Sequence, residues 1–221
     1  MNERRGPDTD AAKLSRATVR RLSQYLRSLG SSDRAGGTVS SLDLARSVGV
    51  SAAQVRRDLA ALGHLGQRGI GYDAAALATA IRRTLGIDRT WRAVLVGVGN
   101  LARALLRYRG FHDQGFFIVG LFDADPAKIG QTIDGLTVES SASIPIRAAE
   151  LQAELGILTV PSEHAQPVAE SLIAGGVKGI LNFAPVLLRT PDRVRVVAVD
   201  LAIQLEQLAF RVQHADPGPD L

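Results

Sequence analysis

Residues 94–106 read VLVGVGNLARALL, and this stretch decides the fold of the chain around it. It predicts a buried strand, a glycine turn and a helix start in immediate succession. Gly97 would permit the tight turn, Gly99 would let backbone N–H groups approach a pyrophosphate, and the small Ala102 would let helix and strand pack closely. The positive end of the helix dipole would add to the attraction for an anion. Glycines also mark ordinary strand-to-helix turns, so the pattern favours a dinucleotide site only together with its flanks.

An acidic residue follows the next apolar strand. Residues 116–122 read FFIVGLF and predict that strand, which Asp123 ends. Asp123 lies 21 residues beyond Ala102, close to the spacing at which an acid accepts hydrogen bonds from the adenosine ribose. The spacing favours NAD(H) over its 2′-phosphorylated relative, because a carboxylate would repel the extra phosphate. The alternative is an ordinary aspartate at a strand end.

Further apolar strands are predicted at 93–96, at 156–160, within 178–185 and at 195–199, with helical segments between them. Strands that alternate with helices indicate an α/β domain with a doubly wound, parallel Rossmann sheet, whose ligands bind at the carboxyl ends of the strands. Several candidate residues fall at such ends. They are Gly97, Asp123, Pro161 and the run from Asn182 to Pro185.

The composition limits the chemistry that is open to the chain. The 221 residues include no cysteine, which excludes disulfides, zinc–thiolate sites and thiol catalysis and fits a reducing cytoplasm. The sequence has no apolar run long enough to span a membrane and no apolar core of a signal peptide near its start. The four histidines lack the spacing of metal ligands. We therefore expect a cytoplasmic protein that binds neither membrane nor metal.

The charge is divided unequally along the chain. Residues 13–92 carry 14 Lys and Arg against 5 Asp and Glu, whereas residues 93–221 carry 10 against 14. A basic first part joined to an acidic second part suggests that the first part meets a polyanion. An arginine-rich, well-solvated surface is the alternative.

The basic part has the pattern of a winged helix-turn-helix. Helices are expected at 13–29, 42–48 and 52–62, with Gly49 in the turn between the last two, and residues 63–72 predict a tight β-hairpin as the wing. Glutamine can pair with adenine, arginine can bind guanine or a phosphate, and an arginine at the tip of a wing can enter a minor groove. A solvated face is the alternative for the second helix. The candidate DNA-binding residues are Ser51, Gln54, Arg56, Arg57, Arg68 and Gly69.

These patterns predict a chain of six parts. Residues 1–12 form a flexible arm, 13–85 the winged-helix domain, 86–92 a hinge, 93–199 the Rossmann domain, 200–213 a dimerising helix and 214–221 a tail. The helix near 200–213 is strongly apolar and must bury the face formed by Leu201, Leu205 and Leu208. It packs either on its own sheet or, as a swapped element, in a two-fold partner that would suit a palindromic DNA site.

A dehydrogenase would need a positioned acid or base beside the nicotinamide. Only His164, close to Pro161, falls near a strand end, and an exposed residue at a helix start is its simpler interpretation. We therefore expect the cofactor to act as a signal and the chain not to be an enzyme. An NAD-dependent oxidoreductase with an accessory DNA-binding domain remains the alternative. A nucleotide-binding domain for another ligand, such as a coenzyme A derivative, is a third possibility.

Taken together, the motifs resemble those of the Rex family of redox-sensing transcriptional repressors, over residues 13–212. The resemblance is carried by short runs in both parts of the chain. They are Tyr25 to Arg27, Ser40 and Ser41, Gln54 to Leu59, Arg68 to Tyr72, Gly97 to Leu101, Tyr108 with Gly110 and Phe111, Phe122 to Asp125, and Lys178 to Pro185. Ala102 departs from the family pattern, which usually has a third glycine there.

The resemblance implies a homodimer that binds a palindromic operator in double-stranded DNA when NAD⁺ dominates and releases it when NADH binds. It implies that Arg27 pairs with the Asp200 of the partner in the DNA-bound state and that Tyr108 takes over this aspartate when NADH binds. It also implies that the last helix is swapped between subunits. The residues assigned to the cofactor are Gly97, Val98, Gly99, Asn100, Leu101, Tyr108, Asp123, Lys128, Pro161, Asn182, Phe183, Ala184 and Pro185.

Overall fold

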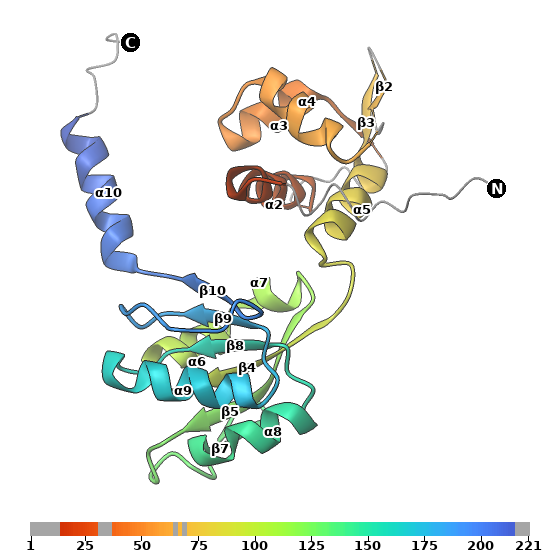
Figure 1. The fold of residues 1–221 in the computed structure, drawn as a ribbon. Coiled ribbons are helices and arrows are strands. Elements are labelled where there is room, and N and C mark those ends of the chain that lie inside the picture. Colours follow the sequence, from red (N-terminus) through yellow and green to blue (C-terminus); the bar gives the residue numbers. More distant parts are fainter. Residues whose placement is uncertain (1–13, 31–36, 64–65, 68–69, 215–221) are drawn as a thin grey trace. The chain divides into compact units, whose positions relative to one another are not determined.

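The computed structural model describes residues 14–30, 37–63, 66–67 and 70–214, and the chain divides into an N-terminal unit, residues 1–89, and a C-terminal unit, residues 90–221. Figure 1 follows the elements along the chain. The N-terminal unit contains α2 (Arg16–Gly30), β1 (Thr38–Val39), α3 (Ser41–Val48), α4 (Ala52–Ala60), β2 (Gly66–Gln67), β3 (Gly71–Asp73) and α5 (Ala74–Leu85).

The boundaries of α3 and α4 follow from local chemistry. Ser40 caps α3 in a capping box with Asp43, and Gly49 ends that helix at a φ of 72°, a left-handed conformation that glycine adopts at no steric cost. Ser51 then caps α4 by accepting a hydrogen bond from the backbone N–H of Gln54. Buried side chains such as Leu22, Leu44, Leu59 and Leu77 pack the helices around one core.

The wing is a three-stranded antiparallel sheet in the order β1-β3-β2. The predicted hairpin accounts for β2 and β3, whereas the sequence analysis did not predict β1. Val39 lies in β1 and pairs with Tyr72. Its side chain is 2% exposed and belongs to the core of this unit. The winged helix-turn-helix that the sequence predicts is thereby confirmed.

The C-terminal unit is a doubly wound sheet, as the alternating pattern predicts. Its strands follow the order β10-β9-β8-β4-β5-β7-β6, and all neighbours are parallel except β6 and β7. The strands are β4 (Trp91–Val96), β5 (Phe116–Asp123), β6 (Thr132–Ile133), β7 (Leu136–Ser140), β8 (Leu155–Leu158), β9 (Gly179–Asn182) and β10 (Arg195–Ala198). The strand order reverses beside β4, between β4 and β8, which is where such sheets bind their ligands.

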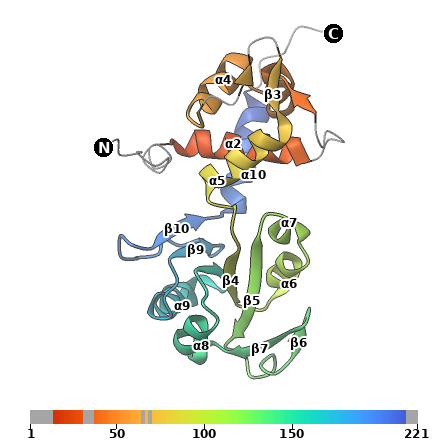
Figure 2. The same cartoon turned by 90° about the vertical axis from the view of Figure 1, so that its right-hand side faces the viewer.

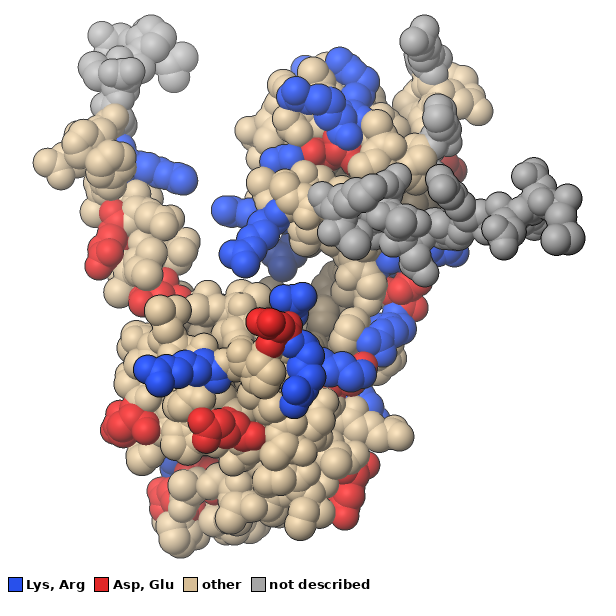
Figure 3. Space-filling view, viewed as in Figure 1, with Lys and Arg blue, Asp and Glu red and all other residues tan. Residues whose placement is uncertain are grey.

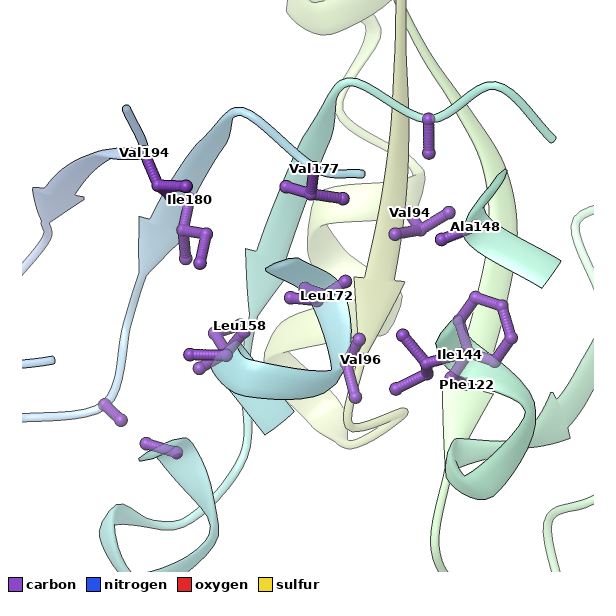
Figure 4. Packing of buried hydrophobic residues seen from close by; sticks show 14 residues of the cluster. Val94, Val96, Phe122, Ile144, Ala148, Leu158, Leu172, Val177, Ile180 and Val194 are labelled. Atoms are coloured by element: carbon purple, nitrogen blue, oxygen red, sulfur yellow. The ribbon is translucent and has the colours of Figure 1, made fainter. Parts of the chain in front are cut away.

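Helices cover both faces of this sheet. Figure 2 shows α8 (Ile144–Glu150) and α9 (Ser162–Ala174) on one side and α6 (Asn100–Leu106) and α7 (Arg109–His112) on the other. Successive side chains of β4 point to opposite faces of the sheet, and each face has its own core. Val94 and Val96 face α8 and α9, where Figure 4 shows them with Ile144 and Leu172. Leu95 points the opposite way and packs with Ala102 of α6.

One predicted boundary in this unit is wrong. Apolar periodicity predicts a helix at 101–109, with Gly110 as its stop. In the structure this helix ends at Leu106, and Gly110 lies inside the separate helix α7. Tyr108 lies between the two helices with an extended backbone, at a ψ of 98°, and occupies the N-cap position of α7. Apolar periodicity alone does not reveal such an interruption. The hairpin of β6 and β7 and the helix α8 were not predicted either.

The last helix, α10 (Leu201–Gln213), begins at Asp200, which caps it by accepting hydrogen bonds from the backbone N–H groups of Ala202 and Ile203. Its apolar side chains are all exposed in the single chain, among them Leu205, which is 66% exposed. The alternative that this helix packs on its own sheet is therefore wrong, and the predicted exchange with a partner stays a prediction. None of the helices in the described parts of the chain is long and apolar enough to cross a membrane.

Candidate nucleotide and nucleic-acid sites

The glycine turn after β4 is held in a conformation that needs glycine at its first position. Gly97 has a φ of 93°, and a Cβ atom there would lie 2.7 Å from the carbonyl oxygen of Thr159. At Gly99 a Cβ atom would meet nothing within 4 Å, so this residue faces open space where a ligand can approach the backbone. Asn100 and Leu101, both exposed, begin the helix that follows.

Thr159 is a residue of this site that the sequence analysis missed. Its hydroxyl donates toward the carbonyl oxygens of Val96, at 3.0 Å, and Gly97, at 2.8 Å. These bonds join the turn after β4 to the exit of β8 across the point where the strand order reverses. In the sequence, the only sign of this role is that Thr159 lies two residues before Pro161, a predicted site residue at the end of a strand. Pro161 itself is exposed.

Asp123 lies against the glycine turn, as its position after the second strand predicts. Its carboxylate is 7% exposed and accepts hydrogen bonds from the backbone N–H of Val98 at 2.6 Å, the backbone N–H of Asp125 at 2.9 Å and the Nζ of Lys128 at 3.0 Å. Burial alone would raise the pKa of Asp123, but these hydrogen bonds outweigh it and hold that pKa below its ordinary value. Asp123 is therefore ionised at neutral pH.

Lys128 changes the electrostatics at this strand end. Its ammonium group lies 3.0 Å from the carboxylate of Asp123 and 3.9 Å from that of Asp125, and a third of its side chain is exposed. The predicted repulsion of a 2′-phosphate rests on the acid alone. A lysine within the same cluster offsets part of that negative charge, which weakens the argument from repulsion.

The exit of β9 is a loop that Asn182 holds from within. The side chain of Asn182 is 1% exposed, donates to the carbonyl oxygens of Ala184 and Val186, and accepts from the N–H of Ala184. All of these bonds stay inside the loop, so Asn182 shapes the site. Ala184 is buried, Phe183 half-buried and Pro185 exposed, and the N–H of Phe183 donates to the end of β8.

Tyr108 stands at the junction of α6 and α7, and is 52% exposed. Its ring packs edge to face on Phe111, with centroids 5.2 Å apart, and folds over Gly110, where a Cβ atom would come within 2.6 Å of its hydroxyl oxygen. The other two residues of the implied switch occupy helix surfaces. Arg27 is exposed on α2, and Asp200 caps α10.

The exposed face of the N-terminal unit over α3 and α4 is basic. Figure 3 shows Lys and Arg side chains gathered there, at the top of the view. Arg56 and Arg57 are both exposed on α4, as predicted. Arg56 donates to the hydroxyl of Ser41 at 3.2 Å, and Arg57 donates to the side-chain oxygen of Gln54 at 2.7 Å. Arg68 and Gly69, which the sequence predicts at the tip of the wing, lie outside the described residues.

Asp58 is the second residue that the sequence analysis missed. It is 4% exposed and accepts hydrogen bonds from Arg21 Nε at 2.6 Å, Arg21 Nη2 at 2.7 Å, Tyr25 at 2.9 Å and Gln54 at 2.9 Å. Burial alone would raise the pKa of Asp58, but the hydrogen bonds from Arg21, Gln54 and Tyr25 outweigh it and lower that pKa. Asp58, Arg21 and Tyr25, which we call the Asp58 clamp, thus join α2 to α4.

Two further features bear on chemistry. His164 is exposed at the start of α9, as its simpler interpretation predicts. Among the described residues, no three His, Cys, Asp or Glu side chains are grouped so that they could hold a metal ion.

Both parts of the chain match known protein families. Residues 88–186 match a family described as CoA binding domain, and residues 13–60 match one described as putative DNA-binding protein N-terminus. A redox-sensing transcriptional repressor Rex from Rhodopirellula baltica is 50% identical over 204 residues, which cover 92% of this chain and 86% of the relative. A protein of the same name from Carboxydothermus hydrogenoformans is 48% identical and covers 91% of this chain and 98% of the relative.

Solved structures agree with these relatives. The crystal structure of RSP in complex with β-NAD⁺ and operator DNA is 34% identical, with a TM-score of 0.85 over 90% of this chain and 93% of that one. RSP in complex with β-NADH is 32% identical, with a TM-score of 0.80 over 90% and 94% of the two chains. Because relatives at these identities extend over most of both chains, this chain belongs to the Rex family of redox-sensing transcriptional repressors.

Proposed function

We propose that this protein represses transcription by binding a palindromic operator as a homodimer, and that NADH binding releases it. The observation that carries the proposal is the similarity, over nine-tenths of the chain, to a repressor that was crystallised with β-NAD⁺ and operator DNA together. A winged helix with a basic face and a glycine turn beside an ionised Asp123 supply the two matching sites.

The cofactor would lie along the carboxyl ends of β4, β5, β8 and β9. The backbone at Gly97 and Gly99 would meet the pyrophosphate, and Asp123 would accept from the adenosine ribose. Oxidised nicotinamide is a cation and reduced nicotinamide is neutral, so an apolar seat near Phe183 and Ala184 favours the reduced form. The release of DNA then depends on how much the affinities for NADH and NAD⁺ differ, and on how each affinity differs between the two states of the dimer.

The two-fold partner would cover α10. A helix with apolar residues along its length is stable in water only when another surface buries it, and a symmetric dimer matches the symmetry of a palindromic operator. Within that dimer we assign Arg27 and the partner's Asp200 to the DNA-bound state and Tyr108 to the NADH-bound state. A repressor acts where the chromosome lies, so we place the protein in the cytoplasm.

The relatives argue against the oxidoreductase that the glycine turn alone would allow. They are named as transcriptional repressors, so the family is one of regulators, which confirms the expectation that the chain is not an enzyme. Coenzyme A remains a competing ligand, because the family that matches residues 88–186 is named for it.

The direct test is a titration of a protein–DNA complex with four ligands. The complex is formed on a duplex that the wild-type protein selects from a randomised pool in the presence of NAD⁺. We expect NADH to release this duplex at concentrations far below those of NADPH or acetyl-coenzyme A, while NAD⁺ keeps it bound. Release by NADH and NAD⁺ at equal concentrations would contradict the proposed sensing, and release by acetyl-coenzyme A alone would reassign the ligand.

Asp123→Ala should weaken NADH binding by about 1–3 kcal/mol, because the ribose hydroxyls lose a charged acceptor and the N–H of Val98 loses its partner. Calorimetry with NADH measures the loss. Asp125→Ala is the matched control, since it removes another carboxylate from the same loop. The side chain of Asp125 is 47% exposed. Equal affinities for wild type and Asp123→Ala would limit Asp123 to a structural role.

A further inference from the structure

Gln54 uses both ends of its side-chain amide within the protein. Its Nε2 donates to Oδ1 of Asp58 at 2.9 Å, and its Oε1 accepts from Nη2 of Arg57 at 2.7 Å. A carboxylate only accepts hydrogen bonds and a guanidinium only donates them, so the two neighbours fix which end of the amide faces which way. The reversed amide would set oxygen against carboxylate and NH₂ against guanidinium.

The inner partner of Gln54 is itself buried and hydrogen-bonded. Asp58 is 4% exposed, and the guanidinium of Arg21 holds it with two bonds while the hydroxyl of Tyr25 supplies a third. Tyr25 is completely buried. Gln54 is therefore a link in a chain of hydrogen bonds that starts in the core of the N-terminal unit and finishes at the exposed guanidinium of Arg57.

This arrangement restricts the base-reading role that the sequence predicts for Gln54. Its amide keeps one more N–H and one more lone pair, but reading adenine needs both on one base edge, and the bonds to Asp58 and Arg57 already fix the plane of the amide. Arg57 is less restricted, because its guanidinium carries five N–H donors and its bond to Gln54 uses one. A guanidinium held in a fixed plane is well suited to a phosphate or to the edge of a guanine.

We propose that Gln54 is a positioning residue, which the Asp58 clamp orients and which in turn holds Arg57 for contact with DNA. The proposal rests on the proposed function, since it assigns roles within the DNA-binding face. It predicts that the effect of Gln54 on DNA affinity passes through Arg57.

A double-mutant cycle on the full-length protein tests this dependence. The probe is the duplex that the wild-type protein selects with NAD⁺, and affinity is measured for Gln54→Ala, Arg57→Ala and the double variant. We expect about a tenfold loss for Arg57→Ala, a loss of similar size for Gln54→Ala, and no further loss in the double variant. Arg56 is the matched control, because it lies beside Arg57 on α4 but donates to Ser41. Losses from Gln54→Ala and Arg56→Ala should multiply.

A second measurement separates positioning from reading. Every base pair of the selected duplex is replaced in turn, and the discrimination at each position is compared between wild type and Gln54→Ala. Positioning predicts that Gln54→Ala changes discrimination only where Arg57→Ala changes it. Losses that multiply in the Gln54–Arg57 cycle, with discrimination lost at an adenine that Arg57→Ala leaves unaffected, would overturn the proposal. A wild-type protein that selects no duplex at all would overturn the proposed function as well.

Discussion

Asp58→Asn is expected to lower the free energy of unfolding of the N-terminal unit by about 3 kcal/mol. The substitution keeps the size of the side chain but leaves the guanidinium of Arg21 without its counter-charge, and it turns one acceptor oxygen into a donor that faces other donors. The side chain of Arg21 is 20% exposed, so water compensates part of the loss and the value stays at the lower end for a broken buried ion pair.

Hydrogen exchange of the full-length protein measures this change, because it reports on α2 and α4 separately from the C-terminal unit. The matched control is Asp88→Asn, which removes an exposed carboxylate from the same unit. We expect faster exchange in both helices for Asp58→Asn and no change for the control. Wild-type exchange rates in the Asp58 variant would show that the clamp contributes little to stability.

The contribution of Asp58 should depend on pH in a defined direction. Its pKa is lower in the folded state than the ordinary value of about 3.9, so the unfolded state binds the proton first as the pH falls. The stabilisation is therefore complete above about pH 5 and is lost progressively as the pH falls toward the folded-state pKa. The difference in stability between wild type and Asp58→Asn should shrink steadily as the pH is lowered from about 5 to about 3, and a constant difference would rule out ionisation of Asp58 as the cause.

Leu205→Glu is expected to convert the protein into a monomer and to reduce operator affinity by about 100-fold or more. In the single chain Leu205 is 66% exposed and Leu201 and Leu208 are exposed as well, so the substitution leaves the chain's own core intact. In a dimer that buries this face, the new charge would lose its hydration. A monomer engages one half-site, so the gain from binding both halves together disappears.

Light scattering gives the oligomeric state, and binding to the selected duplex gives the affinity. Gln207→Glu is the matched control, because it places the same charge on α10 away from the row of Leu201, Leu205 and Leu208. We expect the control to remain dimeric and to bind DNA like wild type. A dimeric Leu205→Glu variant would mean that α10 is covered by something other than a second copy of the chain.

Local patterns predicted the elements that depend on neighbouring residues. Gly97 and Asp123 follow buried strands, and parallel strands bring their carboxyl ends to one edge, so the structure places the two beside each other through the N–H of Val98. Gly49 and Ser51 likewise mark the turn of the helix-turn-helix through their own backbone preferences.

Interactions between distant residues could not be predicted in the same way. Asp58 lies in a helix with two arginines close by in sequence, which suggests a solvated face, and only tertiary packing shows that its partners are Arg21 and Tyr25 on another helix. Thr159 braces the glycine turn from 62 residues away. The break at Tyr108 depends on one extended backbone angle that apolar periodicity does not record.

The Asp58 clamp also bears on the motion that would release DNA under the proposed function. Arg21 and Tyr25 lie on the same helix as Arg27, so we expect a force on Arg27 to displace α2 and α4 together. In the proposed dimer, two such pairs of helices would have to match half-sites whose centres lie about 34 Å apart, or a multiple of that distance. We therefore expect release to come from a change in the spacing and phase of two DNA-binding units that are unaltered internally, and sequence preference to be the same for whatever DNA the NADH-bound protein still holds.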